Sequence, residues 1–170
     1  MTSGKANRRT RTPLYDHDPL VEGRIRSEDL AEYPSIVEDL RGEIIAARRT
    51  HRALSIALLK FSLERSSSTG EATRGQVRKF LQLFGGNLRH TDKCGLVTTA
   101  EALVILPGAE ADGARIAMNR SMAFNFAKRL KGLGLIAEFG IAELASNNGS
   151  TLELIDAART AIHNTEPAVA

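Results

Sequence analysis

Two arginines and one aspartate are the side chains in this sequence most suited to binding an anionic ligand. Arg89 and Asp92 flank a two-residue spacer at the junction between an expected helix and an expected strand. The planar guanidinium of an arginine binds phosphate oxygens in bidentate fashion, and an aspartate accepts hydrogen bonds from N–H donors. An arginine near a helix C-terminus is also stabilised by the helix macrodipole, so Arg89 has a purely structural alternative.

Arg120 is the second arginine of this set. At about 100° per residue, all its nearest helical neighbours are apolar, namely Ile116, Ala117, Ala123, Phe124 and Ala127. We therefore expect Arg120 on the face that packs on the sheet, where an unpaired guanidinium is strongly unfavourable. Its expected partner is an internal carboxylate such as Asp92 or the phosphates of a ligand. A structural ion pair or a snorkelling arginine at the rim of the sheet is the alternative.

Other chemical signatures are weak. No glycine-rich phosphate loop precedes a helix, and no two of the four histidines have the spacing of metal ligands on a helix. The single Cys94 provides neither a disulfide nor a metal cluster, which favours the reducing cytoplasm. The N-terminus lacks the apolar core of a secretory signal, and no apolar run is long enough to span a membrane.

The basic character of the chain, with a pI of about 9.3, is concentrated at its N-terminus. Residues 1–12 carry four basic residues and no acidic one, which leaves 19 basic against 20 acidic residues in the remainder. Four charges supply only non-specific attraction to nucleic acid, and the chain has no Trp and few aromatic residues for base stacking. A nucleic-acid partner is therefore a disfavoured alternative.

The elements that must position these residues alternate between helix and strand. We expect a disordered basic arm at 1–16, a single domain at 17–164 that begins with an ordered wrap to 34, and a frayed tail at 165–170. The hydrophobic periodicity predicts helices over 35–51, about 72–88, about 109–131 and 151–163. It predicts strands over 53–62, 94–98, 101–107 and 135–144, the middle two joined as a hairpin. This order predicts an α+β fold, an α/β sandwich with a ferredoxin-like (palm-like) core in which helices cover one central sheet.

The segment DKCGLVTTAEALVILPG at 92–108 resembles, without a gap, part of the GGDEF family, the diguanylate cyclase domains that make cyclic di-GMP from two GTP. The Gly-Gly-Asp-Glu-Phe signature falls on residues 98–102, which read Thr-Thr-Ala-Glu-Ala. The resemblance covers about residues 18 to 163, supported in order and spacing by DPLV at 18–21, ALSIALLKFS at 53–62, FGIAE at 139–143 and LIDAARTAI at 154–162.

The metal positions of that family are changed in this chain. Cyclases of the family hold two divalent metals with acidic residues on the first strand and in the hairpin, and these positions read as Lys60 and Ala100. Lysine opposes a cation that needs oxygen ligands, although by itself Lys60 is read as a strand-end lysine that reaches solvent. Glu101 alone keeps the family residue, and one carboxylate cannot run a two-metal phosphoryl transfer.

The nucleotide-binding positions of the cyclases are changed as well. The glycine pair that admits the nucleotide is replaced by Thr98 and Thr99, whose branched side chains fill that space. The guanine-recognising positions fall near Ser67 or Ser68 and on Gln76. The resemblance therefore implies a degenerate domain that is no enzyme and uses no metal or cofactor.

The inhibitory site of the family, Arg-x-x-Asp five residues before the signature, is retained. It falls on Arg89 and Asp92, and the additional arginine of the family falls on Arg120, with His90 and Arg115 as possible rim contacts. The resemblance implies a non-catalytic receptor that binds cyclic di-GMP, the arginines gripping phosphate or guanine and the aspartate accepting from the guanine edge. The receptor would signal through an unidentified protein partner.

Two alternatives stay open. One is a GGDEF-derived interaction scaffold that binds no nucleotide, with Arg120 and Asp92 as a structural pair. The other concerns oligomeric state: the helix at 35–51 occupies the place of a signalling stalk in cyclases and could support a homodimer. Its apolar stripe is equally satisfied by packing on its own domain, which is the more common arrangement.

Overall fold

The computed structural model describes residues 31–32, 35–64, 74–124, 126–145 and 149–164. The expected arm at 1–16, most of the expected wrap, the DPLV segment, Ser67, Ser68 and the tail at 165–170 lie outside these residues. Within the described part, no helix is both long enough and apolar enough to cross a lipid bilayer.

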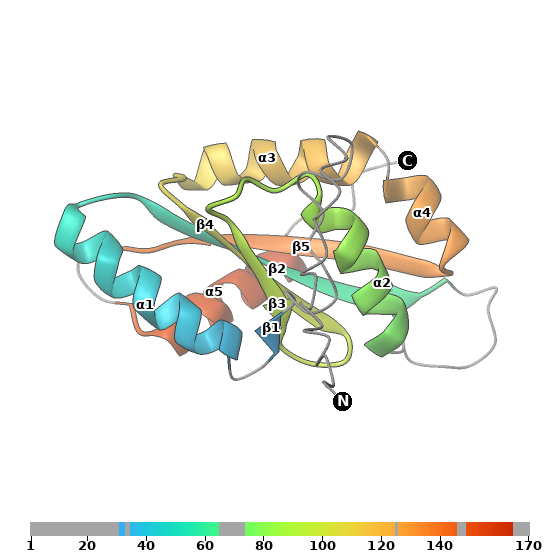
Figure 1. Cartoon of the computed structure of the whole chain (residues 1–170), viewed down its shortest axis with the longest axis horizontal. Helices are drawn as coiled ribbons and strands as arrows, with labels where there is room; N and C mark the ends of the chain where they lie inside the picture. Colours follow the sequence, from blue (N-terminus) through green and yellow to red (C-terminus); the bar gives the residue numbers. More distant parts are fainter. Residues whose placement is uncertain (1–30, 33–34, 65–73, 125, 146–148, 165–170) are drawn as a thin grey trace, which may run out of the picture.

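One five-stranded sheet forms the centre of the molecule (Figure 1). Its strands lie in the order β1 (Ala31–Glu32), β3 (Lys93–Leu96), β4 (Glu101–Pro107), β2 (Leu54–Leu63) and β5 (Leu135–Glu143). The β1–β3 pair is parallel and the other pairs are antiparallel. Strands β2 to β5 with the helices between them have the ferredoxin-like order, which confirms the α+β class and the expected hairpin.

Helices cover both faces of the sheet. One face packs on α2 (Arg74–Gly85), α3 (Ala111–Phe124) and α4 (Phe126–Gly132), and the other packs on α1 (Ser35–Thr50) and α5 (Thr151–Asn164). Strand β2 is buried on both faces from Leu54 to Leu59, as its unbroken apolar run predicts. The apolar stripe of α1 is buried on its own domain.

Two expected boundaries need correction, and one expected helix is described in two parts. The helix predicted over 109–131 is represented by α3 and α4, and residue 125 between them lies outside the described residues. Helix α2 ends at Gly85 rather than near 88. Part of the expected wrap is the strand β1, whose two residues are too few to show a pattern.

Candidate functional site

A cavity of about 650 Å³ opens where the end of α1, the turn before β3 and the start of α3 meet. Arg89 and Asp92 both line it, as the sequence predicts for a shared ligand site. Its other walls come from the α1–β2 connection, the β4–α3 connection and the exposed side of α3, and comprise Arg52, Ala53, Leu106, Pro107, Gly108, Ala109, Glu110, Gly113, Ala114 and Ala117.

The turn between Arg89 and Asp92 is closed by its own hydrogen bonds. The backbone N–H of Arg89 donates to Asp92 Oδ2 at 2.9 Å, and the backbone N–H of Asp92 donates to the carbonyl of Arg89 at 3.0 Å. Burial raises the pKa of Asp92, and the hydrogen bond from Arg89 and its positive charge oppose that shift. The ionised carboxylate therefore carries a cost in desolvation, which these contacts with Arg89 only partly offset.

Arg52 is a second cation of this cavity, and sequence reasoning missed it. Helix α1 ends with His51 in the left-handed region, at φ 51°, and the N–H of Arg52 donates to the carbonyl of Ala47 at 3.1 Å. This helix-ending motif turns the chain so that Arg52 lines the cavity. In the described part of the chain, neither Arg52 nor Arg89 donates a guanidinium hydrogen bond to a protein acceptor, so both remain available to an anion.

The expected burial of Arg120 is wrong. Arg120 is exposed, its neighbour Ile116 is 69% exposed, and the face of α3 that meets the sheet carries Ala114 and Met118. The helical angles that included Ala127 do not apply, because that residue belongs to α4. Among the described residues, Arg120 forms no ion pair with Asp92.

The three remaining predicted ligand contacts lie outside the walls of the cavity. His90 and Arg115 are exposed and do not line it. Arg120 does not line it either, but it shares a helical face with Gly113 and Ala117, which do. Arg120 follows Ala117 by three residues, about 4.5 Å along the axis of α3.

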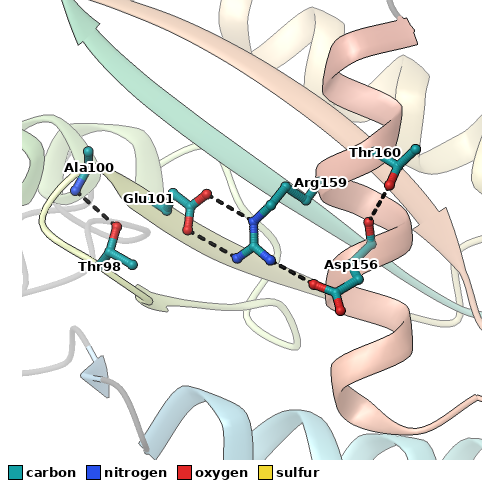
Figure 2. Close-up of polar contacts among 6 residues, drawn as sticks. All are labelled: Thr98, Ala100, Glu101, Asp156, Arg159 and Thr160. Carbon is teal, nitrogen blue, oxygen red and sulfur yellow. Dashed lines mark hydrogen bonds and ion pairs between the residues drawn. The ribbon is translucent and has the colours of Figure 1, made fainter.

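The signature hairpin lies at another part of the sheet, the start of β4 (Figure 2). The hydroxyl oxygen of Thr98 accepts from the backbone N–H of Ala100 at 3.2 Å, and the carbonyl of Ala100 accepts from the N–H of Phe61 at 2.8 Å. Lys60 is exposed, which confirms that it reaches solvent, but β2 continues beyond it to Leu63. It lies in register with Glu101 on β4 and Glu138 on β5.

Glu101 is held by Arg159 of α5, a residue that sequence reasoning also missed. Nε and Nη2 of Arg159 each lie 3.2 Å from a different carboxylate oxygen of Glu101, and Nη1 lies 2.7 Å from Oδ1 of Asp156 (Figure 2). Gln76 is engaged elsewhere, where its amide donates to the carbonyl of Leu133 at 3.0 Å. No local sequence pattern predicts the contact between Glu101 and Arg159, which lie 58 positions apart.

Divalent metals, which the resemblance places at this end of the sheet, do not fit the side chains present. In the described part of the chain, no group of three or more His, Cys, Asp or Glu residues could hold a metal ion. The carboxylate that remains, Glu101, has both oxygens bound to a guanidinium, and a lysine lies opposite it in the sheet.

Comparison with known proteins places this arrangement in context. No family model matches the chain, and no curated protein is similar to it in sequence. The structure is similar to the diguanylate cyclase SiaD of Pseudomonas aeruginosa, solved in complex with its activator SiaC, with a TM-score of 0.66 and 16% identity. That match covers 86% of this chain and 58% of the SiaD chain. The fold is that of a GGDEF domain.

Two further GGDEF domains have a similar structure. The GGDEF domain of FimX from Pseudomonas aeruginosa matches with a TM-score of 0.64 and 10% identity, over 84% of this chain and 92% of its own. The GGDEF domain of DgcB from Caulobacter crescentus, solved in complex with cyclic di-GMP, matches with a TM-score of 0.63 and 14% identity, over 84% and 86%. The structural similarity establishes the GGDEF fold. At identities this low it does not establish the activity of this chain, which has to be argued from its own residues.

Proposed function

We propose that this GGDEF-like domain is a non-catalytic receptor for cyclic di-GMP, which it binds in the cavity of Arg89 and Asp92 and reports to a protein partner. The observation that carries the proposal is the convergence of Arg52, Arg89 and Asp92 on one cavity of about 650 Å³. Two guanidinium groups with no acceptor among the described residues suit the two phosphates of a cyclic dinucleotide. A half-buried carboxylate suits the N–H donors of a guanine edge.

The size of the cavity supports a ligand of this class. Its volume lies in the range of small-molecule sites, whereas a single inorganic anion would need far less space. The wall formed by α3 is lined by Gly113, which has no side chain, and by Ala117, whose side chain is a methyl group. This wall therefore leaves room for a flat base. Arg120, one turn further on the same face, is positioned to contact the part of the ligand that extends outside.

The absence of catalysis is part of the same proposal. Lys60 and Ala100 supply no carboxylate at the positions that the resemblance assigns to metal ligands, and Glu101 is bound by Arg159. GTP with Mg²⁺ should therefore give no cyclic di-GMP in a chromatographic assay. Turnover that depends on Glu101 would contradict this part of the proposal.

Isothermal titration calorimetry with cyclic di-GMP tests the binding site. We expect a Kd of about micromolar or tighter for the unmodified chain. Arg89→Ala and Arg52→Ala should each weaken binding at least about tenfold, because each removes a charge-assisted contact. Arg41→Ala is the matched control, since Arg41 also lies on α1 but its exposed side chain is outside the cavity and pairs with Glu38.

The outcomes separate the receptor from the nucleotide-independent scaffold. Unchanged affinity in both Arg89→Ala and Arg52→Ala would show that the cavity is not the site. No heat and no thermal shift with the unmodified chain would favour the scaffold. The signalling partner would then be sought with the ligand-free domain alone.

A further inference from the structure

We propose that Arg159 is an internal counter-ion of Glu101, so that this part of the sheet excludes divalent cations. The inference deepens the proposed function, because it gives a physical reason for a non-catalytic domain. It concerns the start of β4, directly after the hairpin turn, and not the cavity of Arg89.

The first step concerns the carboxylate of Glu101. Its side chain is only 15% exposed, and a carboxylate with so little solvent contact needs a compensating cation. Arg159 satisfies both oxygens, with Nε on Oε1 and Nη2 on Oε2 at 3.2 Å each. This fork occupies one lone pair of each oxygen and places a positive charge beside both, so a second cation would be repelled at either oxygen.

The second step concerns what holds Arg159 in place. Asp156 lies three residues earlier on α5 and accepts from Nη1 of Arg159 at 2.7 Å, so the guanidinium is fixed between two carboxylates (Figure 2). Mutual hydrogen bonding with Glu101 raises the pKa of Arg159 further above its ordinary value. The cation is therefore permanent and pre-positioned, whereas a metal ion would have to be captured from solution.

The third step concerns the charge that an incoming cation would meet. Lys60 lies directly across the β2–β4 ladder from Glu101, and across the β2–β5 ladder from Glu138. A divalent ion at Glu101 would face the positive charges of Lys60 and Arg159. Since Mg²⁺ and Mn²⁺ need several oxygen ligands, the two basic residues together exclude them.

Restoring a cation site by substitution tests this inference. The probe is Mn²⁺ alone, followed by electron paramagnetic resonance. Lys60→Asp adds a carboxylate opposite Glu101 but keeps Arg159, and the double variant with Arg159→Met also removes the counter-ion. We expect no specific Mn²⁺ binding by the unmodified chain, and binding by the double variant at least tenfold tighter than by Lys60→Asp alone.

Two further variants make the result specific. Adding Glu101→Gln to the double variant should abolish the gained binding, since Glu101 is the expected ligand. Lys60→Asp with Arg159→Lys keeps the positive charge and should bind no more tightly than Lys60→Asp alone. If the methionine variant fails to fold, as judged by circular dichroism, Arg159→Gln replaces it, because glutamine is neutral and still donates a hydrogen bond.

The inference is overturned if the unmodified chain binds Mn²⁺ in a manner that depends on Glu101. It is also overturned if Lys60→Asp binds Mn²⁺ as tightly as the folded double variant, since Arg159 would then exclude nothing. Cyclic di-GMP titration of Arg159→Met should match the unmodified chain, because Arg159 does not line the cavity. Failure of cyclic di-GMP binding in the unmodified chain would refute the proposed function and leave the Mn²⁺ result intact.

Discussion

Gly140 of β5 lies directly against the backbone of α5 at Ala158. A Cβ atom on Gly140 would collide with the carbonyl oxygen of Ala158 and approach the backbone N of Ile162 to 2.7 Å. The strand and the helix therefore pack more closely than any side chain at position 140 permits. Arg159, the residue next to Ala158, lies on the same helix and pairs with Glu101 of β4.

Gly140→Ala should destabilise the domain markedly. The new methyl group meets backbone atoms that cannot rotate away, so α5 must shift, and such overpacking costs roughly 1–3 kcal/mol or more. Urea denaturation would measure the change in the free energy of unfolding. Gly42→Ala is the matched control, because Gly42 lies in α1 with open space around it and alanine there should stabilise by about 0.5–1 kcal/mol. A neutral Gly140→Ala variant would contradict the close packing.

The ionised side chain of Asp92 should lower the stability of the fold at neutral pH, although we propose that the same side chain binds the ligand. Burial raises its pKa above the ordinary 3.8, so the folded state holds the proton more tightly than the unfolded state. The protonated form therefore favours folding below about pH 3.8, and this contribution is lost as the pH rises through the raised pKa. Asp92→Asn, which still accepts from the N–H of Arg89, should be more stable than the unmodified chain at neutral pH.

The gain in stability from Asp92→Asn should disappear as the pH falls toward 3. Thermal denaturation of both proteins over a range of pH would measure this. The same variant should bind cyclic di-GMP more weakly, because a neutral amide is a poorer acceptor for guanine N–H donors. A variant that is less stable at neutral pH, and equal to the unmodified chain at low pH, would mean that the charge of Arg89 outweighs desolvation.

Arg120→Ala should leave stability nearly unchanged. The side chain is exposed, and surface substitutions of this kind usually stay within about 0.5 kcal/mol. The buried arginine expected from the helical periodicity would instead leave a charge partner unsatisfied and destabilise the fold severely. The change in the free energy of unfolding, measured by chemical denaturation, distinguishes an exposed from a buried Arg120. Binding of cyclic di-GMP should weaken less than in Arg89→Ala, because Arg120 lies outside the cavity walls.

The thiol of Cys94 should be unreactive in the native state. Cys94 is buried in β3, and burial raises its pKa to about 12. The thiolate is the reactive species, so alkylation at about pH 8 requires the sheet to open. The rate of iodoacetamide labelling should follow global unfolding and rise as urea is added. Rapid labelling without denaturant would show that β3 opens locally.

The regular elements could be predicted because their signals are local. The strand at 54–63 is a largely apolar segment that is buried over its first six residues, and the hairpin at 93–107 is two short apolar segments around a turn. The start of α5 is encoded by Ser150, whose hydroxyl accepts from the N–H of Glu153 while Glu153 accepts from the N–H of Ser150. Such contacts join residues within one helical turn or one strand.

The sequence by itself determined the α+β fold and the pair Arg89 and Asp92, because these two residues belong to one turn. Only the tertiary structure decided which other charges matter. It exposed Arg120, since an alanine-rich helix has several faces that can pack on a sheet, and it brought Arg52 into the cavity through the end of α1. It also placed Arg159 on Glu101, a contact across 58 residues that forms only when α5 packs on the sheet.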